Sequence, residues 1–139
     1  MIKGRIVFPW ILSVCAGTIV AALLTATVSP SPAMAVESND MENPFAGDPD
    51  AIEYGRVRFS QRCAFCHGGG GTGAKGPALV VGHFKHGGRN EDIFYHVAGG
   101  IPGTQMGAFG RSLSGDEIWK IIAYLRNEER KNREAGHIK

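Results

Sequence analysis

The sequence is short of cysteine and has almost no excess of charge of either sign. Its 139 residues include three cysteines, 15 Lys and Arg, and 13 Asp and Glu. A structural zinc site needs four thiol or imidazole ligands, usually as two close pairs, and the only close cysteine pair is Cys63 and Cys66. A strongly basic field is also missing, which argues against nucleic-acid binding. No Ser, His and acid set, paired-carboxylate site or metalloprotease helix is apparent, so the pattern favours no hydrolytic enzyme.

Glycine, in contrast, is abundant. The chain contains 20 glycines, about twice the usual share. Because glycine disfavours long helices and strands, we expect few regular elements and many loops. The 43% hydrophobic and 20% charged residues are nevertheless typical of a globular protein.

The first 35 residues have the order of a secretory signal peptide. Lys3 and Arg5 precede a long uncharged run that ends in the small-residue triplet Ala33-Met34-Ala35. This order predicts a signal peptide over residues 1–35, cleaved after Ala35, and therefore a periplasmic protein without a membrane segment. The alternative is an uncleaved anchor, because residues 6–28 are long enough to span a bilayer.

The remaining chain is balanced in charge but uneven along its length. Lys3 and Arg5 are the charged residues of the N-terminal segment, so 13 basic and 13 acidic residues follow it. Residues 36–47 contain acidic residues and no Lys or Arg, and we predict that they form a flexible leader. Residues 48–139 are expected to be the folded domain. A third interpretation of the N-terminal segment is lipoprotein processing at Cys15.

The central motif is Cys63-Ala64-Phe65-Cys66-His67, which has the C-x-x-C-H pattern of covalent c-type haem attachment. Two thiols three positions apart can form thioethers with the two vinyl groups of one porphyrin. The adjacent imidazole can then bind the iron from below, because a neutral ring nitrogen is a good iron ligand. The motif predicts one haem c held by Cys63 and Cys66, with His67 as proximal ligand.

Two other interpretations of the cysteine pair are weaker. A thioredoxin-like redox pair accompanies a βαβ pattern, which the sequence lacks, and it would leave His67 unexplained. A disulfide between Cys63 and Cys66 would close a very small loop and contribute little stability.

With further residues, the motif resembles the class I cytochrome c family. The resemblance runs from about Asp48 to Arg130 and is most specific in the haem motif. It implies a small all-α fold of three to four helices, with loops wrapped around one covalent haem and the first and last helices crossing near its edge. The residues that carry it are Gly55, Phe59, Cys63, Cys66, His67, Gly76, Pro77, Leu79 and Met106.

Three helices can be placed from local signals. Asp48 and Pro49 predict a helix start, and this helix should end near Arg62. Asn90 is expected to cap a short helix over about 91–98. Ser114 and Glu117 form a capping box for a last helix over about 115–130, whose apolar stripe is typical of a core-facing helix.

Gly55 is unusual inside the first helix, where glycine costs about 1 kcal/mol relative to alanine. It indicates a close approach by another element. The resemblance suggests an aromatic partner on the last helix, either Tyr124 or Trp119.

The resemblance also assigns the surroundings of the iron. Gly76-Pro77 matches the turn whose carbonyl accepts the N–H of the proximal His67, which would fix the ring. Met106 lies in a stretch rich in glycine and proline, about forty residues after His67, and matches the methionine that binds as the distal ligand. Met41, in the acidic leader, is the less suitable thioether.

Three histidines are rival distal ligands. They are His83, His86 and His96, and an open sixth position is a further alternative. His83 and His86 are expected in a loop, and His96 on the short helix.

The sequence therefore predicts a monomeric periplasmic electron-transfer protein rather than an enzyme. Its partners would be a redox donor and acceptor, with a quinoprotein alcohol dehydrogenase as a donor and a terminal oxidase as an acceptor, as in alcohol or methanol oxidation. One alternative is a haem-based enzyme or gas or redox sensor with a labile distal site. Another is a membrane-anchored cytochrome subunit of an oxidase or dehydrogenase complex.

Overall fold

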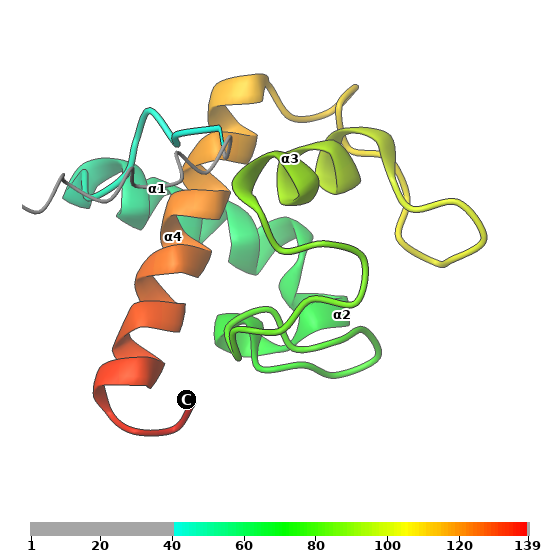
Figure 1. Cartoon of the computed structure of the whole chain (residues 1–139). Helices are drawn as coiled ribbons and strands as arrows, with labels where there is room; N and C mark the ends of the chain where they lie inside the picture. Colours follow the sequence, from blue (N-terminus) through cyan, green and yellow to red (C-terminus); the bar gives the residue numbers. More distant parts are fainter. Residues whose placement is uncertain (1–40, 139) are drawn as a thin grey trace, which may run out of the picture. The chain divides into compact units, whose positions relative to one another are not determined.

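The computed structural model describes residues 41–138, and these form an all-α domain (Figure 1). The elements are α1 (Pro49–Arg62), α2 (Ala64–His67), the 3₁₀ turn η1 (Gly69–Gly71), α3 (Asn90–Gly99) and α4 (Gly115–Glu134). None of the described residues lies in a strand, so the predicted fold class is confirmed. Within residues 41–138, no helix combines the length and the apolar composition that crossing a bilayer requires. The signal peptide expected over residues 1–35, the anchor alternative and Cys15 lie outside the described residues.

The two long helices begin where the sequence predicts. The Asp48 carboxylate accepts hydrogen bonds from the backbone N–H groups of Asp50 and Ala51, at 2.9 and 3.2 Å, and Pro49 is the first residue of α1. At the start of α4, Ser114 Oγ accepts from the Glu117 N–H at 3.2 Å, and Glu117 Oε2 accepts from the Ser114 N–H at 2.9 Å. Each bond satisfies a donor that the helix itself leaves unpaired.

Helix α4 is longer than expected and ends at Glu134 rather than near Arg130. Its last turns carry ion pairs three or four residues apart, which stabilise a helix with little apolar surface. In addition, Asn132 Nδ2 donates to the Val80 carbonyl oxygen at 3.0 Å and ties this end to the loop before α3. The pairs are Lys131 with Glu128, Arg133 with Glu129, and Arg130 with Glu134.

Helices α1 and α4 cross at Gly55 (Figure 1). A Cβ at this position would overlap the backbone carbonyl oxygen of Lys120, so only glycine permits the crossing. The close approach inferred from the sequence is therefore confirmed. The atoms nearest to a Cβ at Gly55 belong to the backbone of Lys120 and Ile121, and none of them comes from Tyr124 or Trp119, the partners that the resemblance suggested. Sequence gives residue types but not the depth at which two helices pack, and here the backbones themselves are in contact.

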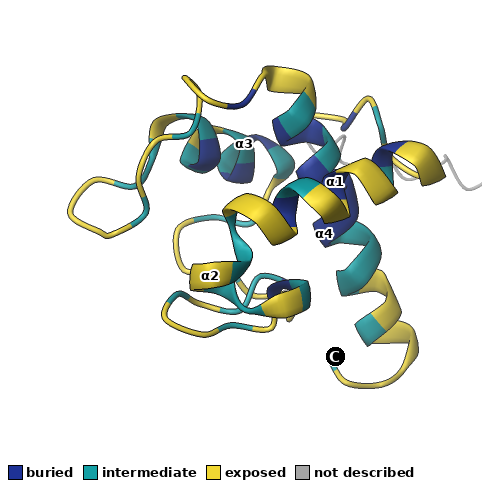
Figure 2. Cartoon of the chain, turned by 180° about the vertical axis from the view of Figure 1, so that it is seen from behind, coloured by how far each residue is buried: buried dark blue, intermediate teal, exposed yellow. Residues whose placement is uncertain are grey.

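The core lies where α1, α3 and α4 meet, and Figure 2 shows the buried faces of these helices turned toward one another. Phe59 of α1 packs against Tyr124 of α4 with ring centroids 5.5 Å apart. Phe94 of α3 stacks on Trp119 at 4.8 Å. The most buried large side chains are Phe59, Ile118, Ile121, Ile122 and Val80.

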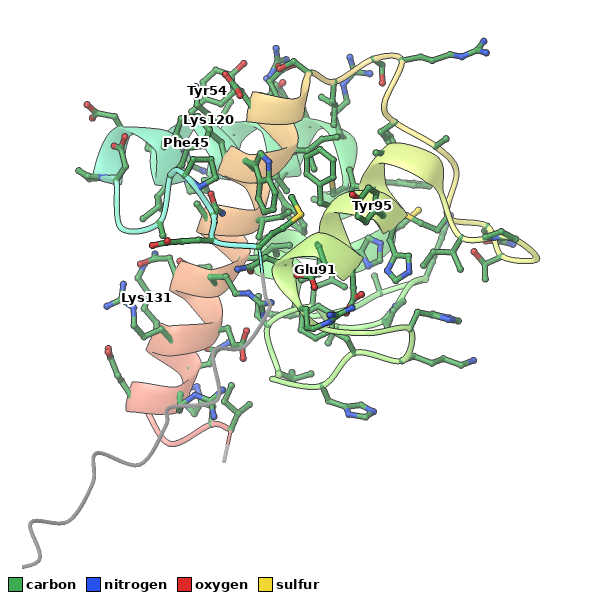
Figure 3. The ribbon with its side chains drawn as sticks, turned by 45° about the horizontal axis from the view of Figure 1, so that its top comes forward. Phe45, Tyr54, Glu91, Tyr95, Lys120 and Lys131 are labelled. Carbon is green, nitrogen blue, oxygen red and sulfur yellow. The ribbon has the colours of Figure 1, made fainter. Side chains whose placement is uncertain are left out.

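Residues 41–47 are packed against the domain, which differs from the flexible leader expected over residues 36–47. Asn43 is only 5% exposed, and its Nδ2 donates to the Trp119 carbonyl oxygen at 2.9 Å. Phe45 and Tyr54 lie on either side of the Lys120 ammonium, with centroids 4.9 and 4.8 Å from Nζ (Figure 3). The buried amide of Asn43 and the Lys120 ammonium between two rings hold residues 41–47 against the domain, although the segment has an acidic composition. Residues 36–40 lie outside the described part of the chain.

Helix α3 begins one residue earlier than expected. Arg89 is the capping residue, and its N–H donates to Asp92 Oδ2 at 3.1 Å. Asn90 was predicted as the cap, but its side chain makes other bonds. Its Nδ2 donates to the Met41 carbonyl oxygen at 3.2 Å, and its Oδ1 accepts from Arg126 Nε at 3.0 Å.

Candidate functional site

The C-x-x-C-H motif folds as a single helical turn. The N–H of Cys63 still bonds to the Phe59 carbonyl at 2.8 Å, and the N–H of His67 bonds to the Cys63 carbonyl at 2.9 Å. Residues three and four apart in a helix lie on one face. Cys63, Cys66 and His67 are therefore presented together by α2 and the end of α1.

This face borders an apolar cavity of about 560 Å³, here named the cysteine cavity. The volume lies in the range of ligand and cofactor pockets. Helix α1 contributes Phe59, α3 contributes Ile93 and Val97, and α4 contributes Ile121 and Leu125. The loops before and after α3 close the remaining sides. Arg62, the last residue of α1, and His96 of α3 also line the cavity. The lining residues of the motif and of these loops are Cys63, Cys66, His67, Lys75, Gly76, Pro77, Ala78, Leu79, His83, Phe84, Lys85, His86, Gly87, Ile101, Thr104, Gln105, Met106, Gly107 and Phe109.

The His67 ring is held by the turn that follows the motif. Its Nδ1 lies 2.9 Å from the Pro77 carbonyl oxygen. Because a carbonyl can only accept, Nδ1 carries the proton in this arrangement and Nε2 keeps a free lone pair. A Cβ on Gly76 would lie 3.0 Å from His67 Cε1, so glycine allows the turn to close against the ring. The geometry agrees with the expected Gly76-Pro77 turn and leaves one nitrogen suited to a metal.

Cys63 and Cys66 form no disulfide with each other. Burial raises the pKa of the Cys63 thiol to about 11, and the neighbouring Cys66 adds to the rise. Cys63 is thus poorly solvated. Its environment is apolar, as expected of a group that contacts a porphyrin edge.

Met106 lies in the wall of the same cavity. Its loop is fixed locally, because the Ile101 N–H donates to the Met106 carbonyl at 3.0 Å and the Met106 N–H donates to Thr104 Oγ1 at 3.1 Å. Met41, the other methionine of the described residues, is 43% exposed and does not line the cavity. The structure therefore brings together all four residues that the sequence selected.

The rival histidines share this cavity. His83 and His86 lie in the loop before α3, and His96 lies on α3 itself. The His86 and His96 rings are 6.2 Å apart, centroid to centroid, in an edge-on arrangement. Their location in the wall keeps histidine ligation as an alternative to Met106.

Sequence reasoning missed the residue that fixes the loop before α3. The Arg126 guanidinium of α4 lies over the Phe84 ring at 5.5 Å and donates to the carbonyl oxygen of Gly88. Phe84 lines the cysteine cavity, so α4 holds this wall through Arg126. The sequence signal was weak, because nothing distinguished Arg126 from the other basic residues in the charged end of the last helix.

The residues of the cysteine cavity fit a covalently bound haem. Two thiols and an imidazole lie on one helical face, a thioether lies in the wall, and no Asp or Glu of the described residues lines the space. A flat apolar ring with a central metal needs this combination of apolar walls and soft or nitrogen ligands.

Comparison with known proteins gives consistent results. A family described as "Cytochrome C oxidase, cbb3-type, subunit III" matches residues 50–125. A cbb3-type cytochrome c oxidase subunit CcoP of Azospirillum sp. (strain B510) is 37% identical over 101 residues, which are 63% of this chain and 34% of that protein. A subunit FixP of Bradyrhizobium diazoefficiens is 37% identical over 83 residues, 52% of this chain and 29% of that protein. The chain thus spans about a third of the length of these curated relatives.

Two solved structures are similar in fold. Cytochrome cL from the marine methylotrophic bacterium Methylophaga aminisulfidivorans MPT has a TM-score of 0.59 at 32% identity, covering 62% of this chain and 58% of that chain. Cytochrome cL from Hyphomicrobium denitrificans has a TM-score of 0.56 at 28% identity, covering 60% and 50% respectively.

Proposed function

Since this chain belongs to the cytochrome c family described as cytochrome c oxidase, cbb3-type, subunit III, with c-type haem as cofactor, we propose that it is an exported mono-haem cytochrome that carries single electrons between redox proteins. The observation that carries the proposal is the cysteine cavity, where two thiols, an imidazole and a thioether border one apolar space. When bound, haem c supplies an iron that gains or loses one electron.

The residues of the cavity have distinct proposed roles. Cys63 and Cys66 hold the haem through thioether bonds, His67 is the proximal iron ligand and Met106 the distal ligand. The Pro77 carbonyl, 2.9 Å from His67 Nδ1, orients the imidazole and raises its basicity. A methionine ligand and the apolar side chains of the wall both favour the reduced state.

Export and partners belong to the same proposal. The N-terminal pattern supports a signal peptide cleaved after Ala35 and a periplasmic location. The oxidase subunits among the relatives support a terminal oxidase as acceptor, and the cytochrome cL structure from a methylotrophic bacterium supports a quinoprotein alcohol dehydrogenase as donor.

A membrane-anchored oxidase subunit is the second candidate. It is favoured by the relatives themselves, which are named as oxidase subunits, and by the long uncharged run over residues 6–28. The mass of the mature protein separates the two, because an anchored subunit keeps this run and a cleaved carrier begins at Val36.

Absorption spectra of the purified, haem-loaded protein test the ligand assignment. We expect a weak thioether-to-iron band in the ferric state that is lost in Met106→Ala and kept in Met41→Ala, the matched control. A band that survives Met106→Ala would contradict the assignment of Met106. If distal ligation is instead lost in His86→Gln or His96→Gln and kept in Met106→Ala, a histidine is the distal ligand. Ready binding of carbon monoxide by the unmodified protein would favour the enzyme or sensor alternative.

A further inference from the structure

The Pro77 carbonyl that lies against the His67 ring belongs to a short loop segment, residues 76–80. At the start of this segment the Gly76 N–H donates to the Cys66 carbonyl at 2.7 Å. This bond ties the segment to the C-x-x-C-H motif itself. It lies one residue before Pro77, so the direction of the Pro77 carbonyl also depends on what holds the end of the segment.

The end of the segment is held by two hydrogen bonds. The Leu79 N–H donates to the Gly71 carbonyl at 2.8 Å. At the next residue, Asn132 Nδ2 of α4 donates to the Val80 carbonyl at 3.0 Å, across 52 positions of the sequence. The Val80 side chain is 2% exposed and belongs to the core, so its carbonyl needs a partner within the protein.

The loop that follows has no backbone hydrogen bonds of this kind. In the part of the chain that the structure describes, no backbone N–H of residues 80–88 donates to a backbone carbonyl. Side chains of α4 hold this loop instead, Asn132 near its start and Arg126 at its end. Asn132 is therefore the α4 contact that lies closest in sequence to Pro77.

The last turns of α4 lie beside the same loop. A Cβ at Gly82 would lie 3.5 Å from both Arg133 Nη2 and Glu129 Oε1. These two α4 side chains pair with each other at 3.0 Å along the helix. Asn132, between them in sequence, instead bonds to the loop backbone.

We propose that Asn132 is a positioning residue for the proximal imidazole. Its amide holds the Val80 carbonyl and so keeps the Pro77 carbonyl in place to accept the His67 N–H. The inference rests on the proposed function, in which His67 binds the haem iron. An imidazole whose Nδ1–H donates a strong hydrogen bond is a more basic ligand, which favours the oxidised iron. Weakening that bond therefore raises the reduction potential.

The experiment compares Asn132→Leu with two controls in the haem-loaded full chain. Leucine keeps the branched shape of asparagine but has no donor. Asn132→Gln is the conservative variant and keeps an amide donor on a longer side chain. Asn127→Leu is the matched control, because the Asn127 amide bonds only along α4, to Glu128 and Arg130.

Two quantities are measured on each protein. The first is the rate at which the His67 Nδ1–H exchanges with deuterium, followed by nuclear magnetic resonance of the nitrogen-15-labelled, reduced protein. The second is the reduction potential, from a redox titration. Far-ultraviolet circular dichroism checks that each variant has native helix content, so that a change at His67 reports its hydrogen bond and not unfolding.

We expect Asn132→Leu to speed the exchange of the His67 Nδ1–H about tenfold, the size of effect that loss of one hydrogen bond to a partly buried carbonyl produces. The same variant should have a higher reduction potential. Asn132→Gln, which keeps the donor, should change the exchange rate by less than about twofold. Asn127→Leu should leave both quantities unchanged.

Two results would overturn the role of Asn132. If Asn132→Leu lowers the melting temperature but leaves the His67 exchange rate and the potential unchanged, Asn132 only fastens the end of α4 to the loop. If Asn127→Leu changes both quantities as much as Asn132→Leu does, the effect belongs to α4 as a whole. Failure of the proposed function has a different signature, because the unmodified protein would then hold no haem through Cys63 and Cys66.

Discussion

Two cavities of equal size, about 560 Å³ each, lie on opposite faces of α4. Ile121 and Leu125 line the cysteine cavity, whereas Ala123 and Asn127 line the second, here named the arginine cavity. The 3.6-residue period of the helix explains this division, because residues two apart point in nearly opposite directions. Volume therefore does not distinguish a cofactor site from a surface hollow, and the chemistry of the lining residues does.

The two linings use their polar groups differently. In the arginine cavity they are bonded within the domain: Asn43 to the Trp119 carbonyl, and Arg126 to Asn90 and Glu129. In the cysteine cavity the two cysteines, His67 and Met106 line a mostly apolar space, and their thiol, imidazole and thioether groups are ligand types for haem iron or its vinyl groups. We infer that a cofactor stabilises the cysteine cavity, while internal hydrogen bonds and ion pairs stabilise the arginine cavity.

Removing the covalent attachment is the strongest test of this difference. We expect Cys63→Ala with Cys66→Ala to lose covalent haem and to be largely unfolded, because the apolar wall then lacks the ring that completes a small, glycine-rich core. Far-ultraviolet circular dichroism would report the loss of helix. Asn127→Ala, in the arginine cavity, is the control and should keep a native spectrum. A native-like spectrum for the double variant would mean that the domain folds without its cofactor.

Much of this arrangement could be predicted because its signals are local. Asp48 and Ser114 begin α1 and α4 by bonding to N–H groups two or three residues away, so short sequence patterns contain the information. The C-x-x-C-H motif is one helical turn, and its spacing alone places three side chains on one face. The roles of Cys63, Cys66, His67 and Met106 remain predictions that the cavity supports.

The features that escaped prediction depend on contacts between distant residues. Asn43 bonds to Trp119, 76 residues away, and nothing in the acidic segment around it signals this partner. Gly55 indicated a close approach, but packing depth decided that its neighbour is the Lys120 backbone. The loop over residues 72–89 has no periodicity, so its contribution to the cavity depends on α4 through Arg126 and on the turn at Pro77.

Arg126 connects the two cavities and provides the second test. It lines the arginine cavity, yet its guanidinium contacts Phe84 and Gly88 of the loop that lines the cysteine cavity. We expect Arg126→Met to lower the free energy of unfolding by about 2 kcal/mol, since charge-assisted bonds of a partly buried group are lost. The reduction potential should also shift, because the wall formed by Phe84 loses its support. Urea unfolding and a redox titration would measure the two effects.

Arg130 is the matched control for this test. It lines the same arginine cavity, but its side chain bonds to Asn127 and Glu134 on its own helix. Arg130→Met should change stability by less than about 0.5 kcal/mol and leave the potential unchanged, as is usual for exposed ion pairs. Equal shifts of potential in both variants would show that the arginine cavity acts through its charge and that Arg126 has no special role in the wall.

The smallest effect concerns Glu117, at the start of the helix that separates the cavities. The Ser114 N–H, and then the Tyr54 hydroxyl and the nearby Arg58, lower the pKa of this carboxyl to about 2. Because the pKa is lower in the folded than in the unfolded chain, the stabilisation is fully present above the unfolded value and is lost as pH falls toward 2. The difference in melting temperature between the unmodified protein and Glu117→Gln should therefore be largest near neutral pH and should decrease as the pH is lowered toward 2. Asp116→Asn is the control, because it removes a charge from the same turn but none of these bonds. The difference in melting temperature that it causes should vary less with pH. If the difference caused by Glu117→Gln is constant from neutral pH to pH 2, ionisation of Glu117 does not stabilise the contact between the two long helices.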